Sequence, residues 1–302
     1  MQTKLLKPVF IIGLHRTGST FLKNIINNNS AIAMATDEMD LFNPWKTTFK
    51  NQFEKLKEKN DKNFSEQLVD LIYNVDIHGT FWEDYRTLNI SKKIIKNRFE
   101  ASDGSLNALI SILLDEYRVL ENKQRAGVKY PLHFSKADIL KQWFPDAKIL
   151  FLYRDARAVC ASKVNDEATI IRKQKAGFLS FLVHYGTLGI FIFEYIWSSS
   201  FFAKHKNALN IYPVCYENLL LDPGKEVRKI CEFCEIPFEQ KMLNAVGKAS
   251  SHNGEIKSGV DKKRLSAWKK RISKVDIFLI TWLTKKSMKK LGYEFKGFDI
   301  NC

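Results

Sequence analysis

Apolar and polar positions along this 302-residue chain follow two different periods. Short runs rich in β-branched and aromatic residues predict buried strands, whereas apolar residues three or four positions apart predict helices between them. The predicted strands lie near residues 8–13, 127–131, 148–153 and 211–216, and the clearest helices lie over residues 102–122 and 135–143. Strands that alternate with helices indicate an α/β fold, with a central parallel β-sheet and helices on both faces.

The first predicted strand runs directly into a short loop of small and polar residues. The strand stops at Gly13, and a helical pattern begins after Leu14-His15-Arg16-Thr17-Gly18-Ser19-Thr20. The first N–H groups of a helix have no partners, and the helix dipole adds about half a positive charge there. Gly18 permits a close backbone approach, while Arg16 supplies a fixed cation. The segment predicts an anion cradle that lacks a Walker A lysine, and an ordinary polar turn is the alternative.

A second strand end repeats this arrangement. Arg154 follows the strand predicted at 148–153, and the helix predicted over 156–164 carries Ser162. In an open α/β sheet, ligands bind at the carboxyl ends of the strands. Two such ends, each with an arginine and a hydroxyl group, predict a ligand with two separated anionic groups.

The motifs at these two strand ends resemble those of the PAPS-dependent sulfotransferases. Residues 15–20 fit the family's loop for the 5′-phosphosulfate, and Arg154 with Ser162 fits its pair for the 3′-phosphate. Tyr216 stands in Val214-Cys215-Tyr216-Glu217-Asn218-Leu219, which looks like the family segment whose tyrosine lies near the adenine. The tail from Ser250 to Lys269 resembles the late loop that closes over the nucleotide. The resemblance extends from about residue 8 to residue 293.

This resemblance implies a P-loop NTPase-like sulfotransferase fold and transfer of a sulfuryl group from PAPS to a hydroxyl acceptor, with release of PAP and no metal. The acceptor is a small molecule, a lipid or a glycan that bears an alcohol or a phenol. One sulfotransferase domain is expected over residues 1–302, with acceptor-facing helical inserts at about 40–100 and 165–205. The residues implied to bind the nucleotide are His15, Arg16, Thr17, Gly18, Ser19, Thr20, Phe21, Arg154, Ser162, Tyr216, Ser251 and Arg264.

The resemblance also implies catalytic roles. Arg16 is expected to stabilise the leaving group, since it lies in the 5′ loop and is always charged. Glu38 is the first candidate for the general base, with a helix N-terminal acid as its alternative role. His133 is the second candidate, with a structural histidine as the alternative, and Lys129 is expected to support the sulfonate or the leaving oxygens. Arg16 replaces the lysine of cytosolic members and is similar to the tyrosylprotein and bacterial branches.

Two other functions are weighed against this one. A nucleotide-dependent phosphotransferase on a P-loop-like scaffold needs a Walker lysine and a magnesium-binding acid at a strand end, and the sequence offers neither clearly. A non-catalytic PAP-binding module would keep its affinity for the nucleotide after loss of Glu38 and His133 but would transfer nothing.

The formal net charge of +15 favours an anionic partner. Most lysines are interleaved with acids on predicted helices, and no nucleic-acid motif is present, so a nucleic-acid partner is not expected. The early first strand and the cysteine usage favour a cytoplasmic protein in a reducing compartment. The oligomeric state is left open.

Residues 177–203 form an unusually apolar segment that His184 and Glu194 interrupt. Core helices are the favoured interpretation, with an apolar acceptor channel or a peripheral contact with the inner face of a membrane as alternatives. A membrane-spanning helix at this position would split one α/β domain.

Overall fold

The computed structural model describes residues 7–35, 49–59, 62–73, 90–244, 246–247, 257–258, 262–296 and 299–301. Glu38 and Ser251, two of the predicted site residues, lie outside these ranges. The roles predicted for them therefore stay predictions.

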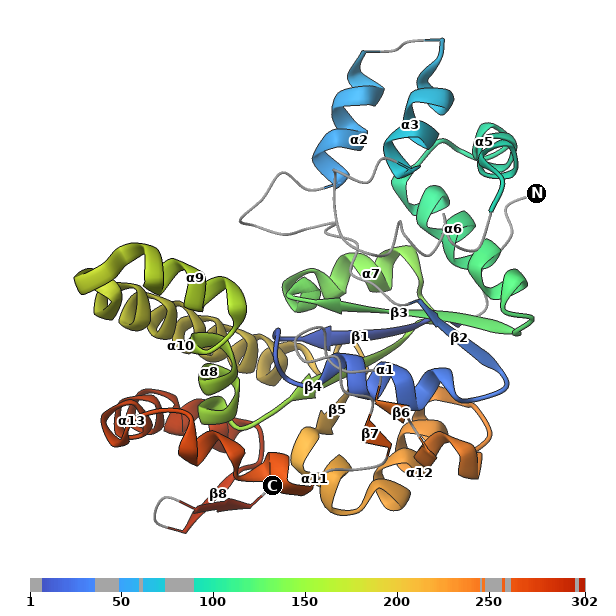
Figure 1. Ribbon diagram of the computed structural model, residues 1–302. Helices are drawn as coiled ribbons and strands as arrows, with labels where there is room; N and C mark the ends of the chain where they lie inside the picture. The colour runs from blue at the N-terminus through green and yellow to red at the C-terminus, as the bar shows by residue number, and fades with distance from the viewer. Residues whose placement is uncertain are drawn as a thin grey trace.

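Five parallel strands form the central sheet in the order β2-β3-β1-β4-β5 (Figure 1). They are β1 (Val9–Gly13), β2 (Ile32–Ala35), β3 (Arg125–Pro131), β4 (Lys148–Tyr153) and β5 (Ile211–Cys215). The predicted α/β class and parallel sheet are confirmed. The hydrophobic pattern did not predict β2, because its sequence Ile-Ala-Met-Ala is short and half alanine, a residue that is depleted in strands.

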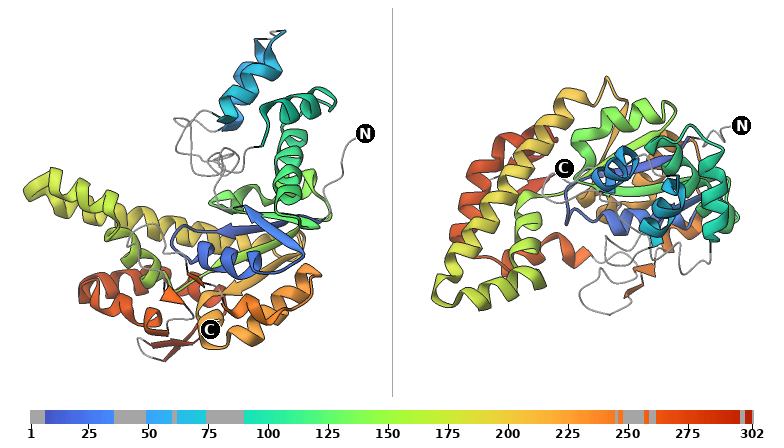
Figure 2. Two further views of the ribbon diagram at one scale, coloured as in Figure 1. Left: turned by 45° about the vertical axis from the view of Figure 1, so that its right-hand side comes forward. Right: turned by 90° about the horizontal axis from the view of Figure 1, so that it is seen from above.

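Helices cover both faces of the sheet and extend beyond its edges (Figures 1 and 2). The described α-helices are α1 (Ser19–Asn27), α2 (Phe49–Glu58), α3 (Phe64–Tyr73), α5 (Lys92–Glu100), α6 (Leu106–Leu120), α7 (Ala137–Trp143), α8 (Ala156–Val164), α9 (Glu167–Ala176), α10 (Ser180–His205), α11 (Tyr216–Leu221), α12 (Pro223–Cys234) and α13 (Lys274–Lys290). The 3₁₀ helices and short strands are η1 (His133–Lys136), η2 (Gly177–Leu179), η3 (Gln240–Asn244), η4 (Lys262–Leu265), η5 (Ala267–Lys270), β6 (Val246–Gly247), β7 (Lys257–Ser258), β8 (Glu294–Lys296) and β9 (Asp299–Asn301).

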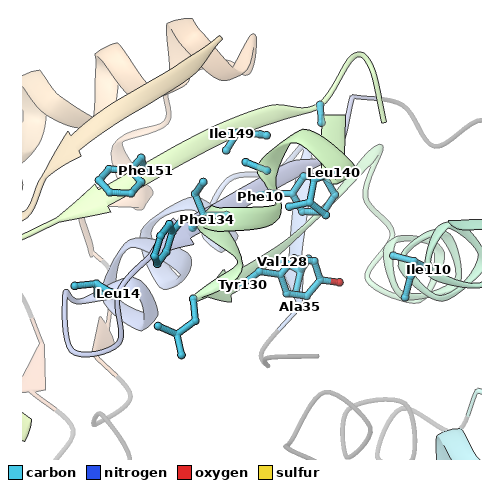
Figure 3. Close-up of a cluster of buried hydrophobic side chains, with 14 of the residues drawn as sticks. Phe10, Leu14, Ala35, Ile110, Val128, Tyr130, Phe134, Leu140, Ile149 and Phe151 are labelled. Carbon is cyan, nitrogen blue, oxygen red and sulfur yellow. The ribbon is translucent and has the colours of Figure 1, made fainter. Parts of the chain in front are cut away.

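Most strand residues are apolar and buried because helices cover both faces of the sheet; β3 also carries Arg125 and Lys129, and Pro213 of the edge strand β5 is exposed. Phe10, Val128 and Phe151 point to one face, where they pack with residues of α6, α7 and α10, as Figure 3 shows for part of this cluster. Val9 and Ile11 point to the opposite face and pack with α1 and α12. This alternation fixes the register of the strands, and with it the level at which each strand ends.

Helices gather in two groups at opposite ends of the molecule, and α6 and α10 connect these groups to the sheet (Figure 1). Helices α2, α3 and α5 gather with α6 at one end of the molecule, and α8, α9, α10 and α13 gather at the other. The described parts of the predicted inserts at 40–100 and 165–205 fall in these two groups. Their expected role in facing the acceptor stays a prediction.

The described cysteines differ in their bonding. Cys231 and Cys234 are buried free thiols on α12, where they pack in the core. Cys215 is disulfide-bonded.

Candidate functional site

The loop between β1 and α1 is shaped by two glycines. Gly13 has φ +144°, and a Cβ atom there would lie 2.3 Å from the Leu152 carbonyl oxygen of β4. Gly18 has φ +99° and a Cβ there would lie 2.5 Å from the ring of Tyr216. Since no side chain fits at either position, the glycines allow the loop to pass close to both neighbours. Thr17 closes the loop by donating a hydrogen bond to the Leu14 carbonyl oxygen at 2.7 Å.

Within the described residues, the N-terminus of α1 has no side-chain cap. Gly18 stands at the N-cap, no side chain caps the helix, and its first turn contains no acidic residue. Ser19 and Thr20 open the helix, and both are half-buried. The unpaired N–H groups and the helix dipole therefore leave a site that favours an anion.

Arg16 joins this loop to the second predicted motif. Its Nε donates to the Ser162 hydroxyl at 2.9 Å, although the two residues are 146 positions apart in the chain. Arg16 has φ 69°, a left-handed conformation that costs about 1–2 kcal/mol for a residue with a side chain. Burial lowers the pKa of its guanidinium; Arg154 and Arg271 act in the same direction, and Asp166 opposes them. The two motifs thus meet in an electropositive site.

Arg154 lies at the end of β4 and faces the same loop. Its guanidinium carbon is 4.3 Å from the centre of the Tyr216 ring, and its Nη atoms donate to the carbonyl oxygens of Arg16 at 3.4 Å and Arg264 at 3.3 Å. Its Nε is buried, and no acceptor among the described residues pairs with it. A buried donor without a partner is uncommon in proteins, so this atom fits a ligand oxygen.

Side chains that the sequence analysis missed hold the peptide bond after Arg154. The Tyr195 hydroxyl donates to the Arg154 carbonyl oxygen at 3.0 Å, and the Asp155 N–H donates to the Glu217 carboxylate at 3.1 Å. Tyr293 in turn donates to Glu217 at 2.8 Å. Both ends of one peptide unit are therefore fixed.

Tyr216 packs between the two strand ends. Its ring lies against Gly18, beneath the Arg154 guanidinium, and meets Phe21 edge-on with the ring centres 6.2 Å apart. The predicted nucleotide residues Arg16, Phe21, Arg154 and Tyr216 thus form one cluster. His15 lies in the same loop and is half-buried.

The segment from Arg264 to Arg271, called the late segment below, packs on α8 through Trp268. The Arg157 guanidinium stacks on the Trp268 ring at 4.4 Å and pairs with both oxygens of Asp155, at 3.0 Å and 2.9 Å. Arg264, in this segment, is exposed and reaches the site through its carbonyl oxygen. Arg271, which no motif indicated, adds positive charge near Arg16.

Lys129 and His133 lie at β3, beside β1. Lys129 stands opposite Ile11 in the strand pair and is buried. The His133 ring is buried, stacks on Tyr130 with centres 4.9 Å apart, and has Nδ1 2.9 Å from the Pro131 carbonyl oxygen. A carbonyl oxygen only accepts, so this contact requires a proton on Nδ1.

The residues that the structure describes contain no group of three or more His, Cys, Asp or Glu side chains placed to hold a metal ion.

Comparison with known proteins identifies the family. A family model described as "Sulfotransferase family" matches residues 8–240, most of the chain. The chain belongs to the sulfotransferase family. This match includes both strand ends and Tyr216, and it ends before the late segment.

Two solved structures share the fold of this sulfotransferase. The sulfotransferase domain from the curacin biosynthetic pathway superposes with a TM-score of 0.59 at 17% identity, covering 97% of this chain and 100% of that one. The sulfotransferase domain of the Synechococcus PCC 7002 olefin synthase gives 0.56 at 19% identity, covering 98% of each chain.

Sequence relatives match this chain over only part of their own sequences. Protein-tyrosine sulfotransferase A of Caenorhabditis elegans is 31% identical over 116 residues, which are 38% of this chain and 29% of that protein. An uncharacterised protein of Aquifex aeolicus is 21% identical over 246 residues, 78% of this chain and 26% of the relative. The chain thus spans under a third of either relative.

Proposed function

We propose that this sulfotransferase uses PAPS as its donor, transfers the sulfuryl group to a hydroxyl acceptor and releases PAP. The observation that carries the proposal is the hydrogen bond between Arg16 and Ser162, which unites the two anion-binding strand ends. A nucleotide with phosphate groups at its 5′ and 3′ positions has the two separated charges that such a site requires.

The loop and the N-terminus of α1 would hold the 5′-phosphosulfate. The backbone N–H groups after Gly18 and the hydroxyls of Ser19 and Thr20 point to this role, since α1 has no cap of its own. Arg154 and Ser162 would bind the 3′-phosphate, with the buried Nε of Arg154 as a donor ready for it. Tyr216 would lie beside the adenine, and the segment with Ser251 and Arg264 would close over the nucleotide.

The transfer requires charge stabilisation and one proton acceptor. The acceptor oxygen forms a bond to sulfur while the bond between sulfur and the bridging oxygen of the 5′-phosphate breaks. Arg16 would stabilise the negative charge that develops on the leaving phosphate, supported by Lys129. Glu38 would take the proton of the attacking hydroxyl, with the Nε2 of His133 as the second candidate. In this scheme the protein supplies position and electrostatics and no metal.

The acceptor is proposed only as a class of hydroxyl compounds: alcohols, phenols, lipids and glycans. The match to a nematode relative named as a protein-tyrosine sulfotransferase adds peptide tyrosine to the phenols worth testing. We also propose that residues 1–302 form one domain, in which the helices of the two inserts face the acceptor.

A transfer assay tests the proposal. The protein is incubated with sulfur-labelled PAPS, without magnesium, and with a panel that contains a phenol, a tyrosine peptide, a sterol and a glycolipid. We expect labelled product from at least one acceptor, and loss of product with Glu38→Gln while PAP still binds. Magnesium-ATP consumption would instead favour the phosphotransferase, and binding without any transfer would favour the nucleotide-binding module.

A further inference from the structure

One group of helices presents apolar side chains to solvent. Helices α9 and α10 form a hairpin that projects away from the sheet, and α13 runs beside α10 (Figures 1 and 2). The large apolar side chains of this group that are more than half exposed, with their exposed fractions, are Phe178 (88%), Phe181 (53%), Leu182 (56%), Ile190 (53%), Phe193 (60%), Val275 (63%), Phe278 (61%) and Trp282 (69%). We call these eight residues the apolar helix face.

The spacing of these residues places them in stripes. Phe178 lies in η2, directly before α10. On α10, Phe181, Leu182, Ile190 and Phe193 fall within about half of the helix circumference at about 100° per residue. On α13, Val275, Phe278 and Trp282 follow one another at intervals of three and four residues, so they lie on one side of the helix. Lys173 of α9 contacts His184 of α10 at 3.0 Å, and His184 contacts Asp276 of α13 at 3.2 Å, so the three helices meet at one polar junction.

The charge around the apolar helix face is almost entirely positive. The basic residues of α9, α10 and α13 are Arg172, Lys173, Lys175, Lys204, Lys274, Lys285, Lys286, Lys289 and Lys290. Their acids are Glu167, Glu194 and Asp276, of which Glu194 and Asp276 are buried. Glu167 is therefore the one exposed acid on these three helices, and the surface complements an anionic partner.

The packing of α10 determines how a lipid bilayer meets this surface. Helices α9 and α10 with the turn between them, Glu167–His205, are long and apolar enough to cross a membrane, and 22% of their most apolar window is buried. However, Leu188, Phe191 and Tyr195 of α10 pack in the main core, and Tyr195 holds the peptide bond after Arg154. Crossing a bilayer would remove these contacts, so the helices are suited to lie on the membrane.

We propose that the apolar helix face docks on an anionic lipid bilayer. The aromatic and aliphatic side chains enter the boundary between headgroups and acyl chains, and the surrounding lysines contact lipid phosphates. A second copy of this chain is a poorer occupant, because it would bring two positive surfaces together. A nucleic acid would match the charge but would leave the apolar side chains without a partner.

Vesicle flotation tests this proposal without donor or acceptor, so its outcome does not depend on the proposed reaction. The probes are vesicles of phosphatidylcholine alone and of phosphatidylcholine with phosphatidylglycerol. We expect binding to the anionic vesicles that weakens with salt. Phe178→Ser combined with Phe181→Ser should weaken it by about tenfold or more, since each change removes inserted apolar surface.

Matched variants separate docking from general surface effects. Val119→Ser with Leu120→Ser removes exposed apolar side chains from α6 and should leave binding unchanged. Lys285→Gln with Lys286→Gln should weaken binding to the anionic vesicles. Thermal unfolding must show that each variant is folded. The molecular mass of the wild-type protein in solution is measured in parallel to detect a dimer.

Three results would overturn the proposal. The first is no binding of the folded wild-type protein to anionic vesicles. The second is binding that the phenylalanine variant retains in full, which would indicate purely electrostatic adhesion. The third is a dimer in solution that the phenylalanine variant dissociates, which would assign the face to a second copy of the chain.

Discussion

The two strand ends of the site supply positive charge in different ways. At the end of β1 the Arg16 side chain acts together with backbone donors of an uncapped helix, and glycine determines the path of the loop. At the end of β4 the charge belongs to the Arg154 side chain, whose peptide bond is held by Tyr195 and Glu217. We therefore expect PAP affinity to depend on the backbone conformation of the loop at the first end. At the second end it should depend on the Arg154 side chain and on the residues that hold its peptide bond.

The largest effect is expected from Gly18→Ala. The new Cβ would overlap the Tyr216 ring in a left-handed backbone, so the loop must move away from both anion sites. We expect PAP affinity to fall more than ~100-fold in a calorimetric titration, since several donors are displaced together. Gly104→Ala is the matched control, because Gly104 also has a positive φ but nothing within 4 Å of the added atom. Equal affinities for both variants would contradict the backbone role of this end.

Arg154→Ala should produce the next largest effect. It removes charge-assisted hydrogen bonds worth about 1.5–3 kcal/mol, so PAP affinity should fall about 10- to 100-fold. The same titration measures it, with Arg228→Ala as a control that removes an exposed arginine from α12. Unchanged PAP affinity would exclude Arg154 as the ligand of the 3′-phosphate.

Tyr195→Phe should have a smaller effect. It removes only the hydrogen bond to the Arg154 carbonyl oxygen, so we expect a two- to tenfold loss of PAP affinity, for about 0.5–1.5 kcal/mol. Tyr185→Phe, which removes an exposed hydroxyl from the same helix, should have no effect. If both variants bind PAP like the wild type, Tyr195 has no part in positioning Arg154.

The smallest effect concerns the pH dependence of stability. Burial raises the pKa of the Glu217 carboxyl above its ordinary 4.5, and the Arg154 charge opposes this shift only in part. The native state then keeps a proton that the unfolded chain has lost, so the free energy of unfolding should fall as pH rises above about 4.5. Glu217→Gln cannot titrate and should flatten this slope in denaturant unfolding measured across pH. Identical slopes would show that Glu217 does not titrate in this way.

The sequence predicted well those features that depend on local pattern. Strands β1 and β4 were recognisable because burial on both faces makes them nearly continuous apolar runs. Strands β3 and β5 were recognisable although Arg125, Lys129 and Pro213 interrupt their apolar residues. The loop after β1 was recognisable because a strand, small residues and a helix must follow one another directly. Strand β2 is too short and too rich in alanine to give this signal.

The sequence could not predict which side chains from distant segments contact the site residues. Tyr195 lies within an apolar helix, and nothing local indicates that its hydroxyl reaches Arg154. Glu217 follows the predicted site residue Tyr216 directly. This adjacency was the only sequence indication that Glu217 contacts Asp155. Arg271 approaches Arg16 only through the packing of the late segment, which Trp268 fixes to α8.

The central claim is that the two strand ends form one site for a nucleotide with two anionic groups. Calorimetric titration of the wild-type protein with PAP in the absence of magnesium tests it most directly, with magnesium-ATP as the comparison ligand. We predict tight binding of PAP without the metal, and weaker binding of magnesium-ATP. A preference for magnesium-ATP, or no heat from PAP, would contradict the account.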